Sequence, residues 1–92
     1  MNIETELTPN PETLKFIVGN KYIFQSGIEI KDKKEAKKFK FSKNLFQLKG
    51  VKRMFIGENF IAVTKEKSIT WNYLKTKILI FILDFITSNK YI

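Results

Sequence analysis

The stretch VKRMFIGENFIAVTK, residues 51–65, decides the fold of this chain. Residues 51–56 and 60–65 are rich in β-branched and aromatic side chains, which are typical of β-strands. Between these runs lies Gly57-Glu58-Asn59, and a short connection that contains glycine is typical of a hairpin. The sequence therefore predicts two antiparallel strands joined by a turn that begins at Gly57.

Three further strands are predicted upstream of this hairpin. Residues 2–7 alternate between two faces, with Ile3, Thr5 and Leu7 on the half-buried face and Glu4 and Glu6 on the charged one, a pattern that suits an edge strand. A second strand is expected at 14–18, where apolar positions again alternate. A third, short strand is expected at about 27–31.

Both prolines of the chain lie between the first two predicted strands, in the segment TPNP. Proline fixes φ and supplies no N–H, so Pro9 and Pro11 interrupt any strand ladder. We predict that Pro9, Asn10 and Pro11 form a rigid crossover rather than a tight two-residue hairpin. The prolines also lower the entropy cost of folding. A purely structural role is favoured over a direct binding site.

An amphipathic helix is predicted over 33–48. Apolar residues recur there at mixed three- and four-residue steps, with lysines between them. Asp32 is suited to be the N-cap, and Gly50 to end the helix in the left-handed conformation.

A second helix is predicted from Trp71 onward, with Ser68 or Thr70 as its N-cap. Its apolar stripe continues to Phe85. Strands joined by short turns, with helices to one side, predict an α+β two-layer sandwich. We expect a mostly antiparallel sheet of about four to five strands with two helices on one face, in the order β-β-β-α-β-β-α.

The last predicted helix is apolar on all sides from 78 to 83, more than one sheet can cover. Deep burial within this domain and docking onto a partner both explain this run, and both remain open. The candidate interaction surface comprises Trp71, Ile78, Leu79, Phe81, Ile82 and Phe85.

The composition argues against catalysis. The chain has no cysteine and no histidine, so it lacks the usual ligands of zinc and iron–sulfur sites and the best side chains for nucleophilic and acid–base chemistry. Glu4 and Glu6 share a strand face and could bind a hard cation, but no third ligand lies nearby in sequence. We expect no catalytic, cofactor-binding or metal site, and we expect the protein not to be an enzyme.

The chain carries a net charge of +8, and sixteen of its seventeen basic residues are lysine. One explanation is a nucleic-acid or anionic-membrane surface, and the other is a compositional bias toward lysine, isoleucine, asparagine and phenylalanine. The second is favoured because arginine dominates base and phosphate recognition. A small basic nucleic-acid-binding protein is kept as the alternative function. The longest apolar run, at 78–86, is too short for a membrane span.

Two stretches resemble a known family. ETELTPNPETLKFIVG, residues 4–19, is similar to the opening strand, Thr-Pro-Asn-Pro turn and second strand of the N-terminal domain of NifU-like (Nfu) iron–sulfur scaffold proteins. LFQLKGVKRMFIGENFIAVTKEKSITWNYLKTKI, residues 45–78, resembles the family's Gly-Val-Lys, Phe-x-Gly and Phe-Ile-x-Val-Thr-Lys pattern, with a tryptophan opening the last helix. The resemblance runs from Ile3 to about Phe85.

The resemblance implies a division of labour. In this family a Cys-x-x-Cys motif of a separate domain holds the iron–sulfur cluster, so this chain would be a non-catalytic accessory domain without a cofactor of its own. Residues 1–88 would form that domain, and 89–92 a tail or the start of a linker. The implied partners are proteins: the cluster-binding domain, assembly machinery or client apoproteins. No targeting segment is seen, so the expected location is the bacterial cytoplasm, or mitochondria in a eukaryote.

Overall fold

The computed structural model describes residues 3–19 and 27–88 of the chain. The elements within them are β1 (Glu4–Leu7), β2 (Thr13–Ile17), β3 (Ile28–Ile30), α1 (Lys33–Ala36), α2 (Lys40–Leu45), β4 (Val51–Ile56), β5 (Phe60–Lys65) and α3 (Trp71–Thr87). Residues 22–24, before the third predicted strand, and the predicted tail at 89–92 lie outside the described residues.

The strands form one sheet in the order β1-β2-β5-β4-β3, and every neighbouring pair is antiparallel. The hairpin predicted at 51–65 is confirmed, since Ile56 pairs with Ile61 on either side of the turn. A register irregularity lies between Val51 and Arg53. The predicted α+β architecture and the antiparallel sheet are confirmed.

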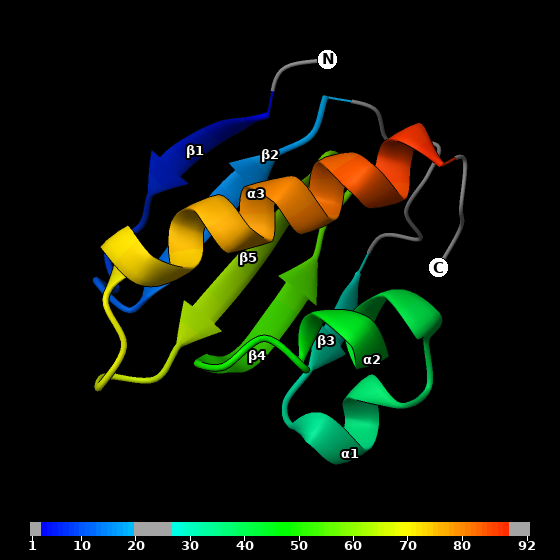
Figure 1. Cartoon of the computed structure of the whole chain (residues 1–92), viewed down its shortest axis with the longest axis horizontal. Helices are drawn as coiled ribbons and strands as arrows, with labels where there is room; N and C mark the ends of the chain where they lie inside the picture. The colour runs from blue at the N-terminus through cyan, green and yellow to red at the C-terminus, as the bar shows by residue number, and fades with distance from the viewer. Residues whose placement is uncertain (1–2, 20–26, 89–92) are drawn as a thin grey trace.

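The helices lie against one face of the sheet, which gives two layers. In Figure 1, α3 runs across β2 and β5, while α1 and α2 lie beside it near β3 and β4. The core between the layers consists of buried apolar side chains: Leu14, Phe16, Val18, Ile30, Ala36, Phe41, Leu45, Phe46, Val51, Met54, Ile56, Ile61, Val63, Leu74, Ile78, Ile82, Phe85 and Ile86.

The single helix predicted at 33–48 is wrong, because the structure divides this segment into α1 and α2. Phe39 is extended, with φ −130° and ψ 139°, and serves as the N-cap of α2. Phe39 and Phe41 are two positions apart, so one continuous helix could not direct both rings to the same side. With the break, Phe41 becomes completely buried, and Ser42 Oγ donates to the Ala36 carbonyl at 2.6 Å.

The predicted N-caps of the helices are confirmed, but the predicted C-terminal end of the first helix is not. The Asp32 and Thr70 side chains accept hydrogen bonds from the backbone N–H groups of Glu35 and Tyr73, as predicted for N-caps. Gly50 does adopt a positive φ of 103°. It does not end a helix, however, because α2 stops at Leu45 and turns separate the two.

Gly57 and Leu7 occupy notable positions in the sheet. Gly57 leaves room for the Phe60 ring, since a Cβ atom at position 57 would collide with that ring unless the side chain moved. Leu7 was expected on the half-buried face of the first strand, yet it is 85% exposed. It pairs with buried Leu14, but it ends a four-residue edge strand that α3 does not cover (Figure 1).

Candidate interaction surfaces

The TPNP segment is a fixed hairpin loop. β1 and β2 are adjacent antiparallel strands, so the predicted crossover between them is wrong, although the connection is indeed longer than a two-residue turn. Thr8 Oγ1 donates to the Asn10 carbonyl at 2.9 Å, and Asn10 Oδ1 accepts from the Glu12 N–H at 2.9 Å. The loop therefore supplies partners for its own backbone and side chains.

Trp71 joins this loop to the start of α3. Its Nε1 donates to the Pro11 carbonyl at 3.1 Å, and its ring meets Phe16 edge-on at 6.4 Å between centroids. Beside it, Lys65 Nζ lies 2.6 Å from a carboxylate oxygen of Glu12. Lys65 is only 7% exposed, so this ion pair fastens β5 to the loop from within. Trp71 thus acts as a structural anchor in this domain.

The candidate residues of α3 separate into two groups. Ile78, Ile82 and Phe85 pack into the core of the domain, so a partner cannot reach them while it is folded. For these three the explanation is deep burial. Leu79 and Phe81 are half-buried at the margin of the core.

Two exposed apolar residues of α3 were missing from the sequence-based list. Ile80 is 63% exposed and Leu83 is 39% exposed. Together with Leu79 and Ile3 they line a shallow hollow between α3 and the N-terminal segment. We call Ile3, Leu79, Ile80 and Leu83 the α3 apolar surface. The signal was present in the sequence, because both residues lie off the core stripe within the run at 78–83.

The two glutamates considered as a cation site lie on the first strand. Glu4 and Glu6 are both exposed on β1, and Glu6 lies 3.5 Å from Lys15 Nζ. Among the described residues, no group of three or more carboxylates could hold a metal ion. Nor does any helix in that part of the chain have the length and apolarity needed to cross a bilayer.

Comparison with known proteins decides the family. The family model described as "Scaffold protein Nfu/NifU N terminal" matches residues 3–89. The chain belongs to this family. It is 39% identical over 90 residues to "NFU1 iron-sulfur cluster scaffold homolog, mitochondrial" of Homo sapiens, covering 97% of this chain and 35% of that protein. It is 33% identical to "NifU-like protein 5, mitochondrial" of Arabidopsis thaliana, covering 98% of this chain and 33% of that protein.

Solved structures share the fold of this Nfu/NifU N-terminal domain. The NMR structure of a NifU-like protein from Saccharomyces cerevisiae superposes with a TM-score of 0.80 at 28% identity, covering 95% of this chain and 79% of that one. A crystal structure of a Staphylococcus aureus protein gives a TM-score of 0.73 at 23% identity, covering 89% and 99%. The latter shows the fold alone.

The Nfu/NifU N-terminal domain described here spans about a third of the length of the curated relatives it matches. Their names place those relatives among mitochondrial iron–sulfur scaffold or NifU-like proteins. The resemblance inferred from residues 4–19 and 45–78 is therefore confirmed as to family.

Proposed function

We propose that this chain is a non-catalytic interaction domain of an iron–sulfur cluster scaffold, and that it supports cluster assembly and delivery without ligating the cluster. The family match over residues 3–89 carries this proposal. The composition of the chain supports the absence of cluster ligation. Iron–sulfur clusters are held by cysteine thiolates, and the chain has neither cysteine nor histidine. The cluster would then be held by a separate cysteine-containing domain.

The α3 apolar surface is the proposed contact with a protein partner, whether a cluster-binding domain, a component of the assembly machinery or a client apoprotein. Isolated exposed apolar residues are ordinary, but contiguous ones around a hollow are typical of interaction sites. Ile80 and Leu83 are the accessible members, and Ile3 and Leu79 continue the surface toward β1. Among residues 3–19 and 27–88, the side chains that line this hollow are all apolar. A partner would therefore present an apolar side chain here.

Cluster binding is tested by reconstitution with iron and sulfide under anaerobic conditions, with the full-length human relative as the positive control. We expect the human protein to acquire a visible iron–sulfur absorption and this chain to remain colourless. A stable chromophore on the isolated chain would contradict the proposed division of labour.

The partner surface is tested in a chimera in which this chain replaces the matching third of the human relative. Ile80→Glu combined with Leu83→Glu places charge on the α3 apolar surface, and we expect cluster transfer to an apo-acceptor to slow by about tenfold or more, as at a small interface hot spot. Asn72→Glu combined with Thr76→Glu is the matched control, since both residues are exposed on the same helix.

Thermal unfolding and circular dichroism of the two double variants verify that the domain stays folded. The proposal requires the control chimera to transfer its cluster at the original rate. Equal transfer by both chimeras would mean that the α3 apolar surface does not contact a partner in this reaction.

A further inference from the structure

A second surface of the domain concentrates its positive charge. Residues 31–43 contain seven lysines and two acidic residues, so they contribute a net charge of +5 to a chain whose total is +8. Local charge of this density attracts an anionic partner and accelerates its association. Its position on α1 and α2 separates it from the α3 apolar surface.

The two acidic residues of this segment are directed at the backbone. Asp32 Oδ1 accepts from the Glu35 N–H at 2.9 Å, and Glu35 Oε1 accepts from the Lys31 N–H at 2.8 Å. These contacts cap the start of α1. Within residues 3–19 and 27–88, the ion pairs found are Lys15 with Glu6 and Lys65 with Glu12, so neither involves a lysine of α1 or α2. The lysines are therefore available to an external anion.

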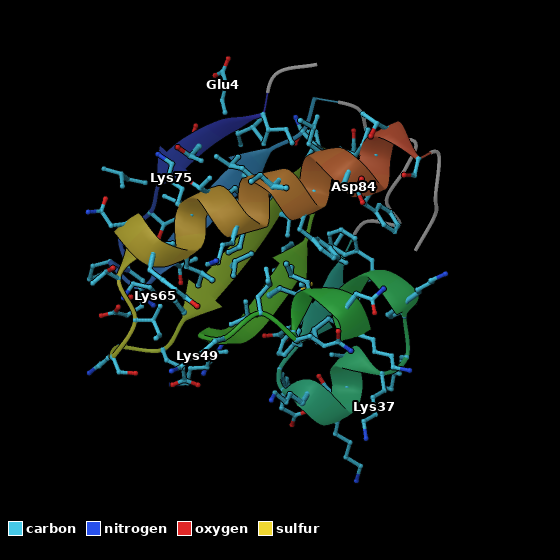
Figure 2. All side chains as sticks on the ribbon, in the orientation of Figure 1. Glu4, Lys37, Lys49, Lys65, Lys75 and Asp84 are labelled. Atoms are coloured by element: carbon cyan, nitrogen blue, oxygen red, sulfur yellow. The ribbon has the colours of Figure 1, made fainter. Side chains whose placement is uncertain are left out.

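Three of these lysines surround a pocket. Lys33, Lys37 and Lys43 line a hollow of about 170 Å³ together with Gln47, and Ala36 and Phe46 form its apolar base. A cavity of about 150 Å³ is large enough for a benzene molecule, so this pocket has room for one branched apolar side chain. Figure 2 shows Lys37 at the end of α1, where it lines the pocket.

We propose that this pocket binds an acidic protein segment that inserts one apolar side chain between carboxylates. The apolar base suits the inserted side chain, and the ammonium groups of Lys33, Lys37 and Lys43 suit carboxylates on either side of it. The inference goes beyond the proposed scaffold function, because it needs neither a cluster nor the α3 apolar surface.

A nucleic acid fits this site less well. Single strands bind where aromatic rings offer faces for base stacking, and arginine supplies the bidentate contacts to phosphate and base. Phe41 and Phe46 are buried, Phe39 packs against the core, and the chain's single arginine, Arg53, lies on β4. The segment thus combines charge with an apolar pocket but lacks a stacking platform among the described residues.

The test uses a fluorescent seven-residue peptide with six glutamates around a central leucine, titrated with the whole chain at about 150 mM salt, where long-range charge effects are screened. A peptide with serine in place of leucine measures the contribution of the pocket. Because a buried leucine side chain is worth a factor of about ten or more, we expect the serine peptide to bind at least about tenfold more weakly.

Two triple variants locate the binding site. Lys33→Glu, Lys37→Glu and Lys43→Glu together should weaken binding of the leucine peptide by about tenfold or more. Lys49→Glu, Lys52→Glu and Lys67→Glu together make the same change in net charge at other exposed lysines, and should leave most of the affinity. Circular dichroism verifies that both variants are folded.

Several results would overturn the inference. Equal losses in the two triple variants, or equal affinity for the leucine and serine peptides, would show diffuse attraction to charge without use of the pocket. Tighter binding of single-stranded oligouridine than of the leucine peptide, lost on reversal of Lys33, Lys37 and Lys43, would identify a nucleic-acid surface instead. No binding of the leucine peptide at millimolar concentration would exclude the proposed site.

Discussion

The two ends of α3 are held in different ways. At its start, Thr70 caps the helix, and Trp71 donates from its ring nitrogen to the Pro11 carbonyl. Farther along, Ile78 and Ile82 are completely buried and Phe85 meets Phe41 at 4.7 Å between ring centroids. The start therefore adds directional polar contacts to the packing of Leu74 and Trp71, whereas the second half is held by apolar packing.

This difference determines what each end can do. Hydrogen bonds at the start fix the helix against one particular loop. Apolar packing in the second half is non-directional, and the helix there is apolar on its outer side too, at Ile80 and Leu83. One helix thus combines a start fixed by hydrogen bonds with a second half that leaves apolar side chains exposed.

The largest effect is expected from a core truncation that removes packing from the second half of α3. Phe41 is completely buried and contacts Phe81 and Phe85 at ring-centroid distances of 5.3 and 4.7 Å. Phe41→Ala should lower the free energy of unfolding by about 3–5 kcal/mol, measured by urea denaturation. Phe55→Ala is the control, because Phe55 is 39% exposed on β4 and its loss should cost much less. Similar losses of unfolding free energy in the two variants would mean that apolar packing is not what holds the second half of α3.

A smaller effect is expected at the start of the helix, where Glu12 neutralises Lys65. Lys65 Nζ lies 2.6 Å from Glu12, and the lysine side chain is only 8% exposed. Glu12→Gln removes the countercharge from a nearly buried ammonium, so we expect a loss of about 1–2 kcal/mol in urea denaturation. Adding Lys65→Met should recover part of it, since the unpaired charge is then gone.

The matched control for this ion pair is Glu6→Gln. Glu6 lies 3.5 Å from Lys15, but the two side chains are 62% and 31% exposed, so this pair should contribute less than about 1 kcal/mol. If Glu12→Gln were as mild as Glu6→Gln, the ion pair beside Trp71 would not hold the loop.

Most of the fold could be predicted because local signals agreed with the final packing. The hairpin at 51–65 has β-branched runs and a glycine turn, and Asp32 and Thr70 are caps whose side chains act on neighbouring residues. The two-residue spacing of Phe39 and Phe41 argues against one continuous helix, but the position of the break depends on where the core accepts Phe41. The exposure of Leu7 likewise depends on how far α3 reaches across the sheet.

The candidate surfaces were harder to predict than the fold. Helical spacing already places Ile78 and Ile82 on one face and Ile80 on the other, but only the docked helix shows which of the two faces is buried and how far Ile80 is exposed. The lysine pocket depends on the turn between α1 and α2, which brings Lys33 and Lys43 to the rim of one hollow. The sequence shows which residues are neighbours along the chain. Which of them share a surface also depends on the angle at which the helices pack.

The smallest effect is expected from the anchoring hydrogen bond itself. Trp71→Phe keeps an aromatic ring against Phe16 but removes the donor to the Pro11 carbonyl, so the loss should be about 1 kcal/mol in urea denaturation followed by circular dichroism. Amide exchange should accelerate at Glu12, whose N–H is bonded within the TPNP loop, and remain unchanged at Ile82. Tyr73→Phe is the control, since Tyr73 is 46% exposed on the same helix. Faster exchange at both amides would show that the two ends of α3 open together. The ends would then differ in the kind of contact that holds them, but they would not unfold independently.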